Sequence, residues 1–281
     1  MRYVRFGPPR AERPGALDGE GRLHDLSAAL ADIDPETIAA GLPRLDDDTL
    51  AARFPRVEGT PRLGSPVARP GKIVCVGLNY RAHIAEVGAS PPREPVLFLK
   101  APTALAGPAD PVVLPSWSLS LDWEVELAMV VGTRIGAGWS GSVSDAVAGF
   151  AIANDLSDRS MQLDRGGQWT KGKSADGFCP LGPWLVTPDA VADPQTLGLT
   201  TRVNGVTRQE GSTADLVFGL DAILAYIGSV MTLLPGDLVL TGTPAGCAMG
   251  MAEPAYLKAG DVMELAIDGL GRQRTLVEAA R

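Results

Sequence analysis

The chain has 281 residues, with 25 Lys or Arg against 33 Asp or Glu, which gives a formal net charge of −8. This acidic balance argues against nucleic-acid binding, which needs clustered positive charge. The sequence contains no run of about 18 apolar residues, the length needed to cross a bilayer. The three cysteines lie far apart and therefore form neither a disulfide framework nor a C-x-x-C site. The first residues lack the apolar core of a secretory signal, so we expect a cytoplasmic protein with no nucleic-acid or membrane partner.

Two domains are predicted, a small N-terminal domain over residues 1–68 and a catalytic domain over residues 69–281. The first contains a predicted strand, a hairpin and a helix interrupted by proline, at Tyr3–Phe6, Gly15–Leu26 and Ser27–Leu42. The proline- and glycine-rich stretch 59–71 is interpreted as a linker or wrapping arm. His24, in the hairpin, is expected at the surface.

In the second domain, short apolar runs bounded by turns predict many strands and hence a strand-rich α+β fold. The clearest predicted helix is Thr213–Met231, with Thr213 as its N-cap. A second helix, begun by Asn79, is expected to carry His83. The predicted strands are Ile73–Val76, Val96–Leu99, Val112–Leu114, Trp123–Val131, Gly149–Ala153, Trp184–Val186, Leu238–Leu240 and Val262–Ile267.

The most informative stretch is an acidic alternation on a predicted strand. Asp122, Glu124 and Glu126 would point to one face of that strand. A solvated sheet face would explain such a pattern, but the strand continues into an apolar run, and Asp155 follows another apolar run. Asp155 alone could be a helix N-cap. Together, crowded carboxylates inside a fold attract a cation, and oxygen ligands suit Mg²⁺, Mn²⁺ or Ca²⁺ and not zinc.

His83 and Glu86 lie three residues apart on the predicted helix. A carboxylate beside an imidazole orients the ring and stabilises its protonated form, which is the arrangement of a general base. An ion pair on the surface of the helix would explain the same spacing.

Residues 167–174, GQWTKGKS, match the phosphate-binding pattern G-x-x-x-x-G-K-S. A nucleotide site needs an apolar strand before this pattern and a helix after it, and the flanking polar residues, glycines and prolines provide neither. The stretch still places Lys171 and Lys173 in a tight turn, where a lysine could stabilise an oxyanion. The loop LTGTPAG, residues 240–246, could expose backbone N–H groups and hydroxyls to a ligand, or be a simple turn.

Taken in order, several segments resemble the fumarylacetoacetate hydrolase family over about residues 72–280. The segments are GLNYRAHIAE (77–86), LDWEVELAMVVG (121–132), ANDLSDRSMQ (153–162), WTKGKSADGFCPLGPW (169–184), LLPGDLVLTGTPAG (233–246) and LKAGDVMELAIDGLG (257–271). The resemblance implies a mixed β-sandwich roll of the family's C-terminal type, a homodimer and a divalent metal, usually Mg²⁺. The N-terminal segment is similar to a bacterial branch that acts on 2,4-diketo-3-deoxy sugar acids.

The resemblance also assigns roles to individual residues. It implies a His83–Glu86 base pair and an oxyanion-stabilising Lys173, and it leaves Asp122 as a neighbour of the ligands. Ser120, Gly177 and the pair Cys247-Ala248 depart from the usual family residues, so the preference of the substrate pocket stays open. The implied metal ligands are Glu124, Glu126 and Asp155, and the implied substrate-binding residues are Tyr80, Arg159, Gln162 and Thr243.

The resulting hypothesis is metal-dependent hydrolysis of the C–C bond of a 2,4-diketo acid, either an acylpyruvate or a 2,4-diketo-3-deoxy sugar acid, to pyruvate and a carboxylic acid. His83 would activate water, and Lys173 would hold the oxyanion. A metal-dependent decarboxylase, tautomerase or isomerase would use the same enolate-stabilising site. A non-catalytic sugar-acid or metal-binding protein, and a nucleotide-binding protein, are the other readings. The sequence leaves open the acyl group, the metal and the role of residues 1–68.

Overall fold

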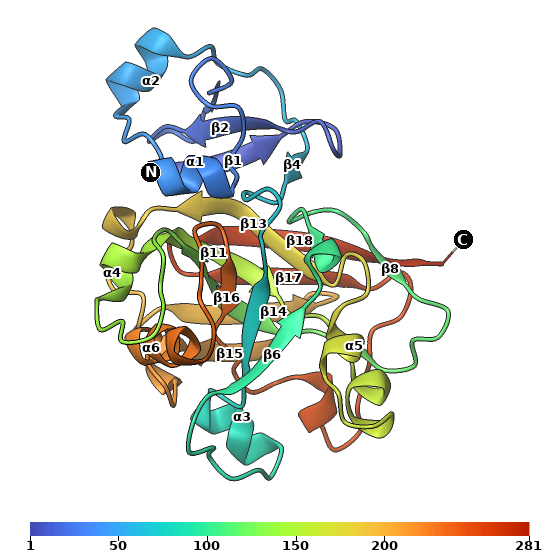
Figure 1. Ribbon diagram of the computed structural model, residues 1–281. Coiled ribbons are helices and arrows are strands. Elements are labelled where there is room, and N and C mark those ends of the chain that lie inside the picture. Colours follow the sequence, from blue (N-terminus) through green and yellow to red (C-terminus); the bar gives the residue numbers. More distant parts are fainter. Residues whose placement is uncertain (281) are drawn as a thin grey trace.

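The computed structural model describes residues 1–280 and consists mainly of two β-sheets with short helices around them (Figure 1). The larger sheet has the strand order β3-β2-β1-β13-β11-β10-β16-β5-β6, with β4 paired to β1 and β7 to β13. Its strands are β1 (Arg2–Phe6), β2 (Arg13–Leu17), β3 (Leu23–Asp25), β4 (Leu63–Gly64), β5 (Ile73–Gly77), β6 (Val96–Lys100), β7 (Leu105–Ala106), β10 (Val125–Val131), β11 (Val147–Asn154), β13 (Cys179–Val186) and β16 (Leu238–Leu240).

The second sheet has the order β15-β14-β17-β18-β8, and a short pair, β12–β9, lies beside the acidic stretch. The strands are β8 (Val112–Leu114), β9 (Leu121–Asp122), β12 (Ser157–Asp158), β14 (Gly198–Val203), β15 (Val206–Ser212), β17 (Val262–Ile267) and β18 (Gly271–Ala279). Most pairings are antiparallel, whereas β5–β16, β7–β13 and β8–β18 are parallel. This mixed, strand-rich architecture confirms the predicted fold class.

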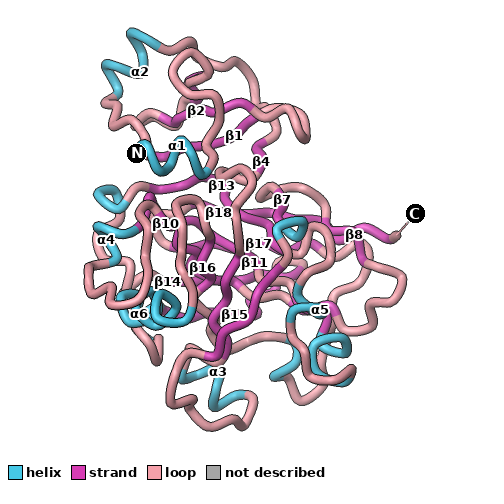
Figure 2. The backbone as a smooth tube through the Cα atoms, viewed as in Figure 1, coloured by secondary structure: helices cyan, strands magenta, loops and turns pink. Residues whose placement is uncertain are grey.

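Short helices connect the strands and cover the ends of the sheets (Figure 2). The α-helices are α1 (Pro35–Ala40), α2 (Asp47–Arg53), α3 (Arg81–Glu86), α4 (Val143–Ala146), α5 (Thr170–Lys173) and α6 (Leu220–Val230). Tighter or wider turns are η1 (Pro102–Ala104), η2 (Ser160–Asp164), η3 (Pro188–Ala190), η4 (Thr213–Asp215) and η5 (Ala248–Gly250). In the described part of the chain, no helix is both long enough and apolar enough to span a membrane.

Strands β10 and β11 form the centre of the larger sheet. All seven residues of β10 are buried, and β11 pairs with it from Val125 opposite Asn154 to Val131 opposite Val147. Because both faces of β10 are covered, its sequence is a continuous apolar run interrupted by Glu126. A charged side chain inside such a run is costly to bury, so its presence marks a site.

The N-terminal segment, drawn in blue in Figure 1, extends the larger sheet through β1. Arg2 pairs with Val186 and Tyr3 with Leu185 of β13, and Tyr3 is fully buried. Hydrogen bonds therefore join this segment to the sheet that carries the acidic cluster, and the division into two domains at residue 68 stays a prediction.

The predicted helix Thr213–Met231 is wrong at its start. Residues 213–215 form a single turn, and the backbone of Leu216 then leaves the helical region at φ −56° and ψ 134°, so α6 begins only after Gly219. Asn79 explains the break, because it binds the extended segment through Val217 N–H to Asn79 O (2.8 Å) and Phe218 N–H to Asn79 Oδ1 (2.9 Å). Asn79 is consequently not the cap of α3, whose N-cap position is Tyr80.

The expectation that His24 lies at the surface is also wrong. Only 4% of His24 is exposed, and its ring lies 3.2 Å from Phe54 O through Nδ1 and 3.2 Å from the Asp18 carboxylate through Nε2. Asp18 also accepts from Arg22 Nε at 2.6 Å. Burial acts to raise the pKa of Asp18, but the hydrogen bonds from Arg22 and His24 outweigh it and hold that pKa below 3.8.

We expect Asp18→Ala to lower the free energy of unfolding by about 1–3 kcal/mol at pH 7, because buried donors lose their acceptor. Since the folded-state pKa is depressed, the contribution of the carboxylate is present above about pH 4 and is lost as the pH falls further. Urea titrations between pH 3 and pH 7 measure this. Glu20→Ala, in the same hairpin but exposed, is the control, and an equal loss of stability there would contradict the assignment.

Candidate active site

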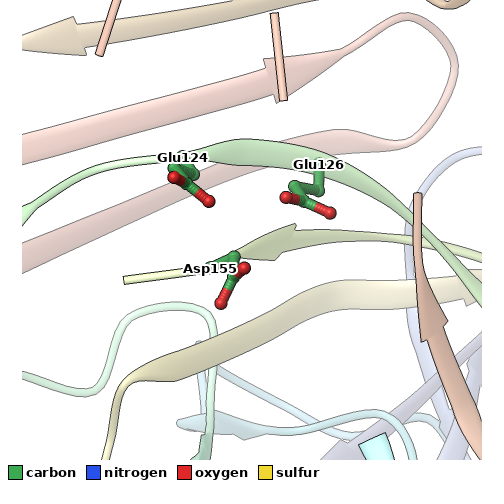
Figure 3. Close-up of side chains that lie close together, drawn as sticks. All are labelled: Glu124, Glu126 and Asp155. Atoms are coloured by element: carbon green, nitrogen blue, oxygen red, sulfur yellow. The ribbon is translucent and has the colours of Figure 1, made fainter. Parts of the chain in front are cut away.

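Three carboxylates meet where two neighbouring strands are interrupted. Glu124 lies in the break between β9 and β10, and Asp155 directly follows β11, with Asp155 N–H donating to Glu124 O at 2.9 Å. Figure 3 shows Glu124, just before β10, and Glu126, within it, on one stretch of chain and Asp155 on the adjacent segment. One oxygen of each lies within 4.8 Å of the others. All three are buried, so the reading as a solvated sheet face is wrong.

Asp155 does not cap a helix. The next element is the short strand β12, and the Asp155 carboxylate contacts two lysines instead: Lys100 Nζ at 2.6 Å and Lys173 Nζ at 2.7 Å. At the start of η2, whose N-cap position is Arg159, the preceding Asp158 accepts from the Met161 N–H at 2.9 Å.

Glu124 is the most strongly paired of the three acids. Lys173 Nζ lies 2.6 Å from its Oε2, and a guanidinium nitrogen of Arg159 lies 2.6 Å from its Oε1. Burial acts to raise the pKa of Glu124, but the charges of Lys173 and Arg159 outweigh it and hold the pKa well below its usual range. These two ion pairs therefore favour the ionised form of Glu124.

Glu126 has the opposite environment. Its Oε2 accepts from Gly242 N–H at 2.7 Å, and no Lys, Arg or His of residues 1–280 forms an ion pair with it. Burial, with the charges of Asp155 and Glu124 next, raises the pKa of Glu126 well above its usual value. The cluster thus contains one carboxylate whose charge needs a further cation.

This donor set fits a divalent metal ion. Only carboxylate oxygens converge, which suits Mg²⁺, Mn²⁺ or Ca²⁺, and the unpaired charge of Glu126 supplies a reason to bind one. Glu124, Glu126 and Asp155 would hold the ion.

A cavity of about 240 Å³ opens beside the carboxylates. His83 lines it and is buried, and its Nδ1 lies 3.2 Å from Glu86 Oε2. The other oxygen of Glu86 accepts from Gly246 N–H at 2.9 Å, which ties α3 to the TGTPAG loop. His83 is therefore part of the cavity wall, with Glu86 behind it, and the two are not an exposed ion pair on a helix. With Nδ1 donating to Glu86, Nε2 carries the lone pair that can accept a proton.

Lys173 and Lys171 have different positions in the turn that resembles a phosphate-binding loop. Lys173 is buried between Glu124 and Asp155, while Lys171 is exposed. The helix α5 has only four residues and leads to β13, so the structure has no long helix at this turn, as expected. The roles of His83, Glu86 and Lys173 in catalysis stay predictions.

The predicted substrate-binding residues separate into two groups. Arg159, Gln162 and Thr243 line the cavity together with the carboxylates. Tyr80 is not among the lining residues within the described chain; it is fully buried, and its ring lies against Gly242. Tyr80 therefore supports the loop that binds Glu126. Its role as a substrate-binding residue stays a prediction, because its side chain does not line this cavity.

Asp122 forms an ion pair with Arg159 and so fixes its position. Arg159 Nε lies 2.9 Å from Asp122 Oδ2, and the same carboxylate accepts from Ala248 N–H at 2.8 Å and Met249 N–H at 3.1 Å. Arg159 also donates to Gln162 Oε1 at 2.9 Å. The Asp122 carboxylate thus orients the Arg159 guanidinium and the loop that follows the TGTPAG segment.

Two buried residues of the site were not singled out from the sequence. Lys100 pairs with Asp155, and its position follows from alternation on β6, where Phe98 and Lys100 are buried and Leu99 is exposed. Gln209, on the second sheet, donates to Thr243 Oγ1 at 2.7 Å and accepts from Val125 N–H at 3.0 Å. Its polar surroundings in the sequence give no sign of burial.

We expect Lys100→Met to lower the free energy of unfolding by about 3 kcal/mol, the lower end of the cost of breaking a buried ion pair. The loss is limited because Lys173 still contacts Asp155. Denaturant unfolding measures it. Lys258→Met, at an exposed lysine, is the matched control, and equal stability of the two variants would contradict a supporting role for Lys100.

Comparisons with known proteins agree with this geometry. The family model described as fumarylacetoacetate (FAA) hydrolase C-terminal matches residues 72–278. The 2,4-didehydro-3-deoxy-L-rhamnonate hydrolase of Sphingomonas sp. (strain SKA58) is 45% identical over 282 aligned positions, covering 100% of this chain and 97% of that protein.

Two solved structures are similar over nearly the whole chain. Maleylpyruvate hydrolase from Sphingobium sp. SYK-6, in complex with manganese (II) ion and pyruvate, has a TM-score of 0.80 and 30% identity and covers both chains completely. The 2-hydroxyhepta-2,4-diene-1,7-dioate isomerase from Mycobacterium marinum has a TM-score of 0.76 and 33% identity and covers 99% of this chain and 98% of its own.

Proposed function

The chain belongs to the fumarylacetoacetate hydrolase family, and we propose that it cleaves the C–C bond of a 2,4-diketo acid with a divalent metal ion, giving pyruvate and a carboxylic acid. The observation that carries this proposal is one cavity lined by His83, which Glu86 holds from outside the lining, and by Glu124 and Glu126 of the acidic cluster. Hydrolysis of a carbon–carbon bond needs an electrophilic centre to draw electrons and a base to activate water, and this cavity supplies residues for both.

A bound divalent ion would supply the Lewis acidity that draws electron density toward the carboxylate and 2-oxo oxygens of the substrate. The buried charges support a cation in this place. Four buried carboxylates, on Asp122, Glu124, Glu126 and Asp155, face three buried cations, on Lys100, Arg159 and Lys173. When all four carboxylates are ionised, these residues carry one negative charge that the three cations do not neutralise, and a divalent ion would offset it.

In this account, His83 Nε2 takes a proton from water as the water oxygen forms a bond to C4. Glu86 holds the ring and stabilises the imidazolium. The C3–C4 bond then breaks, its electron pair passes into the 2-oxo group as the enolate of pyruvate, and a proton returns to C3. Lys173, whose ammonium is buried at the cavity wall, would stabilise the oxyanion that forms at C4.

We further propose that Mg²⁺ is the working ion, that the protein acts in the cytoplasm and that it forms a homodimer, as the family resemblance implies. The physiological ion is tested by activity with Mg²⁺, Mn²⁺ and Ca²⁺ after dialysis against EDTA. The oligomeric state is tested by sedimentation.

An isomerase is the second candidate, favoured by the likeness to the dioate isomerase structure. The decisive experiment is pyruvate release from acetylpyruvate, fumarylpyruvate and a 2,4-diketo-3-deoxy sugar acid, each with Mg²⁺ and with EDTA. Metal-dependent pyruvate from any of the three supports hydrolysis. A change in ultraviolet spectrum without pyruvate, or release of CO₂, would support isomerisation or decarboxylation at the same site.

A further inference from the structure

The cavity has two chemically different parts. Around Glu124 and Glu126 its wall is charged and polar and includes Gln162 and Thr243. Away from them most of the wall is formed by apolar side chains: Val76, Leu78, Val87, Phe98, Leu163, Trp169 and Met249. Phe98 and Trp169 pack together with ring centroids 5.3 Å apart. Leu163 is 43% exposed, so the apolar part also contains solvent-accessible surface.

The apolar part is a built feature of the fold. Leu78 has a φ of +53°, a left-handed conformation that costs energy for a leucine and that clusters at functional sites. Trp169 lies directly against Gly77, where any Cβ would collide with its ring. Three stretches far apart in the chain, residues 76–98, 163–169 and 249, contribute these side chains, so their common character does not follow from one apolar run.

The cations that line the cavity are already paired, within the part of the chain that the structure describes. Arg159 donates to Asp122, Glu124 and Gln162, and Lys173 contacts Glu124 and Asp155. His83 pairs with Glu86. A second substrate carboxylate would therefore have to compete with these protein carboxylates for the same cations, and an ionised carboxylate against the apolar wall would lose hydration without compensation.

From these observations we infer that the acyl end of the substrate is a short, uncharged and predominantly apolar group, and that the enzyme discriminates against 2,4-diketo acids with a second carboxylate. This inference rests on the proposed function, since it assigns the charged part of the cavity to the 2-oxo acid end. It restricts the substrate class to monocarboxylic acylpyruvates and terminally deoxygenated sugar acids.

Two acids that differ at one end test the inference. Butanoylpyruvate and succinylpyruvate are the same except that a terminal methyl in the first is a carboxylate in the second. We expect kcat/KM to be at least about tenfold higher for butanoylpyruvate, since an unpaired buried charge costs this much or more. Equal values, or a preference for succinylpyruvate, would overturn the inference and leave the proposed hydrolysis standing.

Binding separates this result from a failure of the proposed function. Calorimetric titration of both acids into the His83→Ala variant needs no turnover, and we expect the same preference there. Absence of pyruvate from both of these acids and from all three acids of the panel above, with the wild-type enzyme and Mg²⁺, would overturn the proposed function. Tighter or equal binding of succinylpyruvate would overturn the inference.

A charge added to the apolar wall should weaken the discrimination. Leu163→Arg places a cation at a partly exposed lining position, and we expect the preference for butanoylpyruvate to fall at least about threefold. Val230→Arg adds the same charge at a position 59% exposed at the end of α6 and outside the cavity lining, and it should keep the wild-type ratio. Met249→Lys is a second variant at the wall. An unchanged ratio in both wall variants would contradict the inference.

Discussion

Replacing His83 by alanine should lower kcat by about 10²–10⁴-fold, the usual contribution of a positioned general base. The ring is buried at the cavity wall, and its Nδ1 is held by Glu86, so that Nε2 is the atom available to take a proton from water. Steady-state pyruvate release with saturating Mg²⁺ measures the loss. Partial recovery of kcat with added imidazole would identify the missing group as a base and not as a structural support.

His24→Gln is the matched control for this prediction, because His24 is the other histidine of the chain and lies outside the cavity lining. It should lower stability, since its ring contacts Phe54 O and Asp18, but leave kcat of the folded protein unchanged. Full turnover by His83→Ala would remove His83 from the mechanism.

The second large effect is expected at Glu126. Glu126→Gln keeps the shape of the side chain and an oxygen that accepts from Gly242 N–H, but it removes the carboxylate that has no ion-pair partner among residues 1–280. We expect the Mg²⁺ affinity to fall by more than the ~10–100-fold that loss of an outer-shell partner costs. Activity should fall to the level seen with EDTA. Calorimetric titration with Mg²⁺ measures the affinity.

Stability gives this variant a second, independent readout. Without added metal, Glu126→Gln should be at least as stable as the wild type, because it removes a buried carboxylate that faces Asp155 and Glu124. Glu264→Gln makes the same change at an exposed position of β17 and should alter neither affinity nor stability. Unchanged Mg²⁺ affinity in Glu126→Gln would contradict the assignment of the ligands.

The short apolar strands were predictable because each is a short apolar run bounded by turns. β8, β16 and β17 lie at the predicted residues, whereas β10 begins at Val125 and not at Trp123. The late start has a local cause: Glu124 N–H donates to Asn154 Oδ1 at 3.0 Å, outside the regular ladder, and this interruption gives Glu124 its place beside Asp155. A hydrophobic pattern contains no information on such a break.

Strands β14 and β15 were missed because they are polar, although a turn signal was present. Asn204 and Gly205 join them, with φ of +51° and +78°, and an Asn-Gly pair between strands is a strong hairpin signal. In the predicted helix 213–231, Gly219 is the one local sign of the break between the turn 213–215 and α6. The break itself depends on hydrogen bonds to Asn79, which is more than 130 residues away.

The three candidate metal ligands could be predicted from the sequence because carboxylates repeat on one face of a strand that is otherwise apolar. Burying such charges is costly unless they have a partner. Only some of the cations that neutralise these carboxylates could be predicted from the sequence. Lys173 was found in its turn, but Lys100 ends an apolar strand and reaches Asp155 across 55 residues of sequence. Tyr80 was placed in the site by resemblance, whereas the fold places it behind Gly242.

The most direct test of the account is the fate of the C4 carbon of a 2,4-diketo acid. Butanoylpyruvate labelled with ¹³C at C4 is incubated with the enzyme and Mg²⁺, and the products are followed by ¹³C NMR, with EDTA as the control. The account predicts that the label appears in the carboxylate of butanoate, with equimolar unlabelled pyruvate, and that EDTA stops the reaction. Label retained in an intact carbon skeleton, or accompanied by CO₂, would contradict it.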